Sequence, residues 1–222
     1  MGSVHTAYDW DWAAGAAALK QAALLAPREP ITQFFTAREA IIVGHYDDAL
    51  AHMRATLAQD PLMPTAHLGI CWIQQRRGHL AEAESAVRRA LEIIPTYVSA
   101  HFYLGQVLLA RGESEAALVA MQEETPLGGK LGGLALAYYA LGRKAESDAA
   151  LSQFIKEQPD WPFAIAEVYA YRGELDSAFE WLDRAYSIRD SSLYLIKGDP
   201  SLKNLEGDSR YKAFLKRMNL PE

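Results

Sequence analysis

Histidine and cysteine are the residues of this sequence best suited to metal or nucleophilic chemistry. His67 and Cys71 stand four residues apart, a spacing that lets two side chains on one helix chelate a metal ion. His101 lies 34 residues after His67, at an equivalent place in the repeat described below. A zinc site needs further ligands, and no others stand near this pair. We therefore interpret Cys71 as a packing residue and predict no metal site and no cofactor.

Other catalytic patterns fail on their details. In the stretch LGGKLGG, Gly129 and Lys130 are followed by Leu131, whereas a phosphate-binding loop requires Ser or Thr there. No Ser–His–Asp triad or carboxylate pair can be singled out, because the acidic residues scatter over outer helix faces. We predict that the chain is not an enzyme. We interpret LGGKLGG as a flexible, frayed entry to a helix, since glycine costs a helix about 1 kcal/mol relative to alanine.

The elements that would position any site repeat along the chain with a period close to 34 residues. Glycines mark five turns, at Gly44, Gly78, Gly112, Gly142 and Gly173. A small residue stands seven positions before each turn glycine, at Ala37, Cys71, Gly105, Ala135 and Ala166. Another stands five positions after it, at Ala49, Ala83, Ala117, Ser147 and Ala178. Two antiparallel helices approach closely only where small side chains face each other. One such pair cannot bury its own apolar face, so neighbouring pairs stack.

This pattern resembles the tetratricopeptide repeat (TPR) family from about Trp10 to Tyr186. The resemblance implies an all-α, right-handed superhelical solenoid of antiparallel helix pairs, with about five repeats, an N-terminal half repeat and a C-terminal capping helix. We expect the half repeat at residues 1–29, five helix pairs at 30–190 and a capping segment at 191–222. The amphipathic stretch SRYKAFLKRM would form the cap over the last repeat.

A narrower resemblance concerns the segments YDWDW, LALAYYALGRKAESDAAL, IAEVYAYRGELDSAFEWLDRAY and DPSLKNLEGDSRYKAFLKRMNLP. These are similar to the C-terminal arrays of bacterial multidomain regulators, where the repeats follow a winged-helix or nucleotide-cyclase domain. The resemblance implies that the chain is a fragment of a longer bacterial regulatory protein. Alternatively, the half repeat at the start is a native cap or a self-association surface.

In TPR arrays the first helix of each pair lines the concave surface, so the resemblance also implies a binding groove. The predicted groove-lining positions are Phe34, Arg38, Leu68, Trp72, Gln75, Arg76, Phe102, Gln106, Tyr139, Phe163, Glu167 and Tyr171. Aromatic and arginine anchors are typical of binding hot spots. We predict a peptide with apolar anchors and an acidic group directed toward Arg38 and Arg76. The alternative is that several of these aromatic residues simply pack between neighbouring helices.

Charge and hydropathy narrow the classes of partner. The net charge is −6, and no basic face suggests a nucleic-acid partner. No apolar run is long enough to span a bilayer, and the start of the chain lacks a secretory signal, so we predict a cytoplasmic protein with no membrane partner.

The predicted function is protein–protein interaction through the groove. The alternative is an oligomerisation scaffold, with Trp10 and Trp12 at an uncovered N-terminal end mediating a homodimer.

Overall fold

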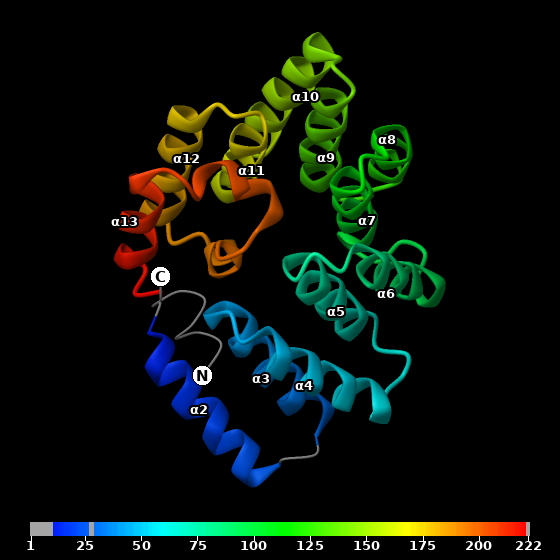
Figure 1. Cartoon of the computed structure of the whole chain (residues 1–222), viewed down its shortest axis with the longest axis vertical. Helices are drawn as coiled ribbons and strands as arrows, with labels where there is room; N and C mark the ends of the chain where they lie inside the picture. The colour runs from blue at the N-terminus through cyan, green and yellow to red at the C-terminus, as the bar shows by residue number, and fades with distance from the viewer. Residues whose placement is uncertain (1–10, 27–28, 221–222) are drawn as a thin grey trace.

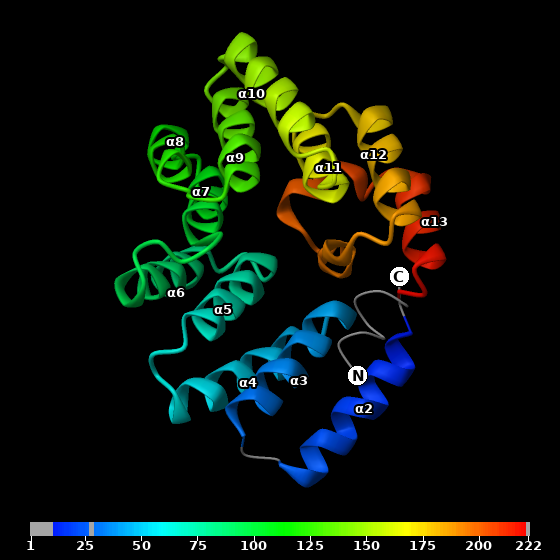
Figure 2. The same cartoon turned by 180° about the vertical axis from the view of Figure 1, so that it is seen from behind.

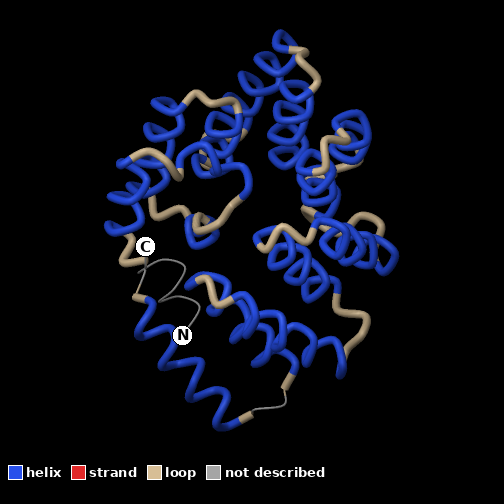
Figure 3. The backbone as a smooth tube through the Cα atoms, in the orientation of Figure 1, coloured by secondary structure: helices blue, strands red, loops and turns tan. Residues whose placement is uncertain are grey.

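The computed structural model describes residues 11–26 and 29–220, and these form an all-helical chain without strands (Figure 3). The helices follow one another as antiparallel pairs along a curved stack (Figure 1). Their bounds are α2 (Trp12–Leu25), α3 (Pro30–Val43), α4 (Tyr46–Gln59), α5 (Pro64–Arg76), α6 (Leu80–Ile93), α7 (Ala100–Ala110), α8 (Ser114–Gln122), α9 (Leu127–Ala140), α10 (Lys144–Glu157), α11 (Pro162–Tyr171) and α12 (Leu175–Ser187). Two 3₁₀-helices, η2 (Ser191–Leu195) and η3 (Pro200–Leu205), then lead to α13 (Ser209–Arg217). No helix among the described residues is long and apolar enough to cross a membrane.

The helix pairs turn where the sequence predicts. All five turn glycines have positive φ angles, from +72° at Gly142 to +86° at Gly44, a region that residues with a Cβ rarely adopt. The small residue that follows each turn is fully buried, at Ala49, Ala83, Ala117, Ser147 and Ala178. Large side chains fill the remaining space: Met53, Val87, Met121 and Leu182 are also fully buried. The close contact of small residues therefore holds the two helices of each pair together.

The stretch LGGKLGG differs from the sequence-based expectation of a flexible entry, because it forms the first two turns of α9. Its glycines are positions of close packing. A Cβ on Gly133 would lie 2.8 Å from Met121 Cγ, and one on Gly128 would lie 2.9 Å from the indole ring of Trp161. Packing energy outweighs the poor helix propensity of glycine here, so these residues bring α9 close to its neighbours.

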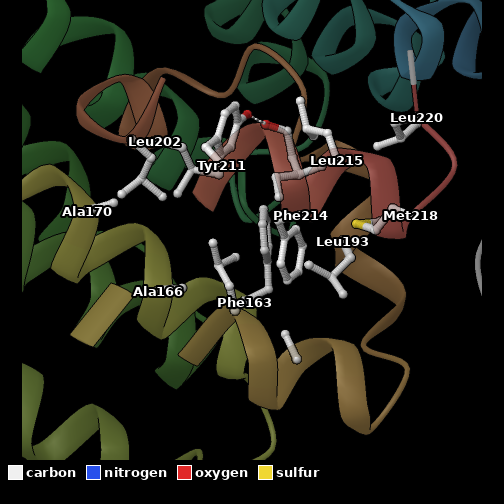
Figure 4. Close-up of a cluster of buried hydrophobic side chains, with 14 of the residues drawn as sticks. Phe163, Ala166, Ala170, Leu193, Leu202, Tyr211, Phe214, Leu215, Met218 and Leu220 are labelled. Carbon is white, nitrogen blue, oxygen red and sulfur yellow. Dashed lines mark hydrogen bonds between the residues drawn. The ribbon is translucent and has the colours of Figure 1, made fainter. Parts of the chain in front are cut away.

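The C-terminal segment closes the arc of helices. Leu193, Ile196, Leu202 and Leu205 are buried at 1 % exposure or less, in one cluster with residues of α11, α12 and α13. Figure 4 shows Leu193, Leu202, Tyr211 and Phe214 gathered over Phe163 and Ala166 of α11. The Tyr211 hydroxyl donates to the carbonyl of Ile196 at 2.9 Å, which ties α13 to the segment between η2 and η3. Residues 191–205 are therefore an integral part of the hydrophobic core.

The two ends of the described chain meet. Trp12 is 9 % exposed, and its indole N–H donates to the carbonyl of Met218 at 2.7 Å. Both views show α2 beside the end of α13 (Figures 1 and 2). The sequence-based picture of an uncovered N-terminal end at Trp12 therefore needs correction, because the C-terminal segment covers this side chain. Trp10 lies outside the described residues.

Candidate partner-binding groove

The concave side of the helix stack contains two adjoining chambers. The aromatic chamber has a volume of about 220 Å³ and lies between α5, α7, α9, α11 and η2. Aromatic rings make up much of its wall: Trp72, Phe102, Tyr103, Phe154, Trp161 and Phe163. The polar chamber has a volume of about 470 Å³ and lies between α5, α7, α11 and residues 198–206. Gln75, Arg76, Gln106, Leu136 and Asp199 line both chambers and so form the partition between them.

Two carboxylates fix the helices that carry the aromatic wall. Glu124, just after α8, accepts from the backbone N–H groups of Ser99 and Phe102 at 3.0 and 2.8 Å. Asp190 accepts from the N–H of Phe163 at 3.1 Å, at the start of α11. A carboxylate at a helix N-terminus satisfies free N–H groups and favours the positive end of the helix dipole. These two caps hold Phe102 and Phe163 in place at the chamber.

Arg76 holds the partition between the chambers. Its guanidinium donates to the carbonyls of Leu195 and Lys197 at 3.0 and 3.2 Å, and it lies 3.7 Å from the carboxylate of Asp199. The Arg76 side chain is only 3 % exposed. Beside it, the amide of Gln106 donates to the hydroxyl of Ser201 at 3.0 Å. Arg76 in the groove wall thus binds the backbone that follows η2, through the carbonyls of Leu195 and Lys197 and the carboxylate of Asp199.

A second acid, Glu167, lies buried against Asp199. The two carboxyl groups share a hydrogen bond, and burial raises the pKa of each above its ordinary value. Arg76 opposes that rise at Asp199, whereas the charge of Asp199 raises the pKa of Glu167 further. Within this pair the fold therefore favours the protonated form of Glu167, as the hydrogen-bond donor to Asp199.

Some buried donors on the concave side have no acceptor. Among the described residues, the indole nitrogen Nε1 of Trp72 and the amide nitrogen Nε2 of Gln75 are buried without a hydrogen-bond partner, and both side chains line the aromatic chamber. Arg38 Nε is also buried without a hydrogen-bond partner, although the Cζ atom of its guanidinium lies over the ring of Tyr194, 4.9 Å from the ring centroid. Burying a donor without an acceptor is unfavourable, so these groups reduce the stability of the fold.

Comparison with known proteins identifies the repeats. Tetratricopeptide repeat models match residues 40–96 and, in a second form, residues 74–128 and 133–192. The chain belongs to the tetratricopeptide repeat family. The curated proteins include no relative with significant sequence similarity.

Solved TPR structures share this fold at low sequence identity. TTC0263, a TPR protein from Thermus thermophilus, matches with a TM-score of 0.64 and 20 % identity, over 77 % of this chain and 91 % of that one. PilW, a type IV pilus biogenesis factor, gives 0.56 and 20 %, over 85 % and 92 %. YrrB, a TPR protein with an unusual peptide-binding site, gives 0.51 and 20 %, over 81 % and 96 %. At these identities the likeness supports the fold alone.

The TPR register places many of the predicted groove residues at the two chambers. The residues lining the aromatic chamber include Trp72, Gln75, Arg76, Phe102, Gln106, Phe163 and Glu167. Tyr171 lines the polar chamber and packs edge-on against Tyr139, whose hydroxyl donates to the carbonyl of Arg172. Phe34 and Leu68 are instead buried between neighbouring helices, which is the alternative that the sequence left open.

Other lining residues escaped the TPR register. Tyr103 follows a predicted groove place directly and packs edge-on against Trp72, with ring centroids 5.2 Å apart. Trp161 stands just before α11, and Asp199 lies where the repeat period is lost. Trp161 was a usable signal, because tryptophan is enriched among binding hot spots. No sequence pattern singles out Asp199, because it approaches Arg76 only in the folded chain.

The two repeat-equivalent histidines have a structural role. The Nε2 atom of His67 lies 3.1 Å from the carbonyl of Pro61, and that of His101 lies 3.0 Å from the carbonyl of Pro95. Each histidine thus contacts the loop that enters its own helix pair. Cys71 is fully buried, and burial raises the pKa of its thiol to about 12. In the described part of the chain, no three His, Cys, Asp or Glu side chains gather as a metal site would require.

Proposed function

We propose that this chain is a non-catalytic interaction module that binds a peptide, or a segment of a partner domain, in its concave TPR groove. TPR proteins act as protein–protein interaction modules, and this chain has their fold. One observation carries the proposal. The groove already binds an irregular backbone segment of this same chain. Arg76 contacts the carbonyls of Leu195 and Lys197 and the carboxylate of Asp199 in that segment.

The same contacts refine the kind of partner. The sequence suggested an acidic group of the ligand at Arg76, but Asp199 of the chain itself fills that role. A partner must therefore use what residues 191–205 leave accessible, which is the aromatic chamber and the polar chamber. Apolar anchor residues suit the first, and polar groups suit the second, where Lys203 and Glu206 form part of the wall.

The proposal can be tested by selecting peptides from a phage-displayed library on the immobilised full chain. The selected peptides should fail to bind the Trp72→Ala variant and should still bind the Val119→Ala variant. Val119 is 61 % exposed on α8 and lines neither chamber, so it is a control on the outer surface. Selection of peptides that bind both variants equally would place the binding surface elsewhere. Recovery of no peptide that binds the wild type would contradict the proposal.

We further propose that the chain works in the bacterial cytoplasm as part of a larger regulatory protein. The support is the similarity of its C-terminal stretch, DPSLKNLEGDSRYKAFLKRMNLP, to the arrays of such regulators. The sequence upstream of Tyr8 in the natural gene decides this point. A winged-helix or nucleotide-cyclase domain there would support it, and an unrelated or absent upstream domain would contradict it.

Self-association through the N-terminal helix is a second candidate function, and one observation favours it. Leu24 and Leu25 at the end of α2 are 70 % and 79 % exposed, and Ile31 at the start of α3 is 53 % exposed. Adjacent exposed apolar side chains mark interaction surfaces. The occupant would be a second copy of this chain. Light scattering should then give a dimer for the wild type and a monomer for the double variant Leu24→Ser, Leu25→Ser. A monomer for both at high concentration would exclude it.

A further inference from the structure

An acidic pocket adjoins the aromatic chamber at the start of α11. It has a volume of about 280 Å³ and shares part of its wall with the chamber, because Trp161, Ala164 and Ser192 line both. Neighbouring residues of a peptide have their Cα atoms about 3.8 Å apart, so one short segment can occupy both spaces from the shared wall. The residues that line the acidic pocket are Asp160, Trp161, Ala164, Asp190, Ser191 and Ser192.

The aromatic chamber suits an apolar side chain of a ligand. Its volume of about 220 Å³ equals the liquid volume of roughly seven water molecules, which is enough for one large side chain. Six aromatic residues line it, and one of them, Trp161, is 43 % exposed at the shared wall. An apolar side chain that covers this ring and enters the chamber would gain the hydrophobic free energy of burial.

The acidic pocket contains carboxylate charge that the chain does not neutralise. Asp190 accepts from the backbone N–H groups of Ser192 and Phe163 at 2.8 and 3.1 Å, so its carboxylate lies against the wall of the chamber. Asp160 is exposed and directly precedes Trp161. Within residues 11–26 and 29–220, no cationic side chain forms an ion pair with either aspartate. A cation of a ligand can therefore pair with them.

The other charges around the chamber do not cancel this negative balance. Among the described residues, Arg76 is the one cation that lines the chamber, and it already pairs with Asp199. Burial raises the pKa of Glu167, and the charge of Asp190 adds to that rise, so the field of Asp190 extends into the chamber. The start of α11 opposes this field only in part, because a helix N-terminus is equivalent to about half an elementary charge. A basic ligand is therefore favoured over an acidic one.

We propose that the partner segment carries an apolar anchor residue with a Lys or Arg beside it. The anchor fills the aromatic chamber, and the basic side chain pairs with Asp160 and Asp190. This inference rests on the proposed function and specifies the chemistry of the partner. It reverses the sign of the ligand charge predicted from the sequence, because Arg76 pairs with Asp199 and Arg38 lines neither chamber nor the acidic pocket.

Blocked dipeptides test the proposal without knowledge of the partner. The probes are the N-acetyl amides of phenylalanyl-lysine, phenylalanyl-glutamine, phenylalanyl-glutamate and glycyl-lysine. Each is titrated at low ionic strength into the ¹⁵N-labelled full chain while the indole N–H resonance of Trp161 is followed. We expect phenylalanyl-lysine to bind about threefold more tightly than phenylalanyl-glutamine, the effect of a solvent-accessible ion pair, and phenylalanyl-glutamate to bind most weakly of the three. Glycyl-lysine, which lacks the anchor, should give no saturable shift.

A matched pair of variants assigns the charge. Asp160→Asn should remove most of the preference for phenylalanyl-lysine and leave the affinity of phenylalanyl-glutamine unchanged. Asp160 is changed in preference to Asp190, because Asp190 also caps α11. Glu82→Gln is the control: Glu82 is exposed on α6 and lines none of the three spaces, so the preference should remain. Equal effects of the two variants would mean that only the net charge matters, and would overturn the assignment of the acidic pocket.

Three further outcomes would overturn the proposal itself. They are a Trp161 resonance that no phenylalanyl probe moves, binding of phenylalanyl-glutamate as tight as that of phenylalanyl-lysine, and equal binding of glycyl-lysine and phenylalanyl-lysine. If library-selected peptides still bind and still require Trp72, the groove function stands and only this inference fails. If no selected peptide binds at all, the proposed function fails with it.

Discussion

Arg76 on α5 and Asp199 before η3 approach within 3.7 Å, and their side chains are 3 % and 8 % exposed. This ion pair joins the second helix pair of the TPR stack to the segment that follows the last one. Since the same guanidinium also holds the carbonyls of Leu195 and Lys197, one side chain fixes the position of the groove wall. The shape of both chambers therefore depends on Arg76.

Arg76→Ala should destabilise the fold strongly, because it leaves the carboxylate of Asp199 buried without its cation. We expect a loss of about 3–5 kcal/mol in the free energy of unfolding, measured by urea denaturation. The neighbouring Arg77 is the matched control: it pairs with Asp47, whose side chain is 88 % exposed. Arg77→Ala should cost less than about 1 kcal/mol. Equal losses for both variants would contradict the structural role of Arg76.

Glu167→Gln should make the protein more stable at neutral pH. The pKa of Glu167 is raised in the fold, so its stabilising contribution is complete below the unfolded pKa of 4.5 and is lost as pH rises through the folded value. Glutamine still donates to Asp199 but does not titrate. We expect the variant to have a higher free energy of unfolding than the wild type near pH 8, and this difference to vanish near pH 4. Parallel stability curves from pH 4 to 8 would refute the proton-sharing pair.

Gly133→Ala should destabilise the protein although it improves the helix propensity of α9. The new Cβ would lie 2.8 Å from Cγ of the fully buried Met121, and overpacking of this kind costs about 1–3 kcal/mol. A flexible, frayed stretch would give the opposite sign, a gain of about 1 kcal/mol. Thermal denaturation of the variant decides between the two, since only the close-packed helix lowers Tm.

Trp12→Phe should loosen the contact between the two ends of the described chain. The substitution removes the 2.7 Å hydrogen bond to Met218 and leaves that carbonyl buried, at a cost of about 1–3 kcal/mol. Ser187→Ala is the control, because its hydroxyl donates to the carbonyl of Arg184 at 2.8 Å in an exposed position, and the loss of this bond should cost about 0.5 kcal/mol or less. Hydrogen exchange at the α13 amides should rise for Trp12→Phe alone. Unchanged exchange in both variants would argue against the contact.

The sequence was sufficient for the solenoid because its rules are local and repeat. Turn glycines such as Gly78 and small contacts such as Ala83 recur at fixed spacing, and each has one structural solution. Groove places such as Trp72 follow from the same register. The glycines of α9 were misinterpreted because their role comes from contacts with Met121 and Trp161, which no local pattern shows.

The C-terminal segment could not be placed from the sequence for a similar reason. Beyond Asp190 the period is lost, and the contacts of Arg76 are with backbone carbonyls, which any residue supplies. The buried hydrogen bond between Glu167 and Asp199 likewise joins acids from distant parts of the chain. The partition of the groove into two chambers thus became visible only in the folded structure.

The most direct test of the groove as a binding site is the affinity of a library-selected peptide, measured by isothermal titration calorimetry on the full chain. Trp72→Ala should raise Kd by more than about 30-fold, as expected for a hot-spot residue, while Val119→Ala leaves Kd unchanged. A Kd that is the same for the wild type and Trp72→Ala, or one that rises only for Val119→Ala, would contradict binding in the concave groove.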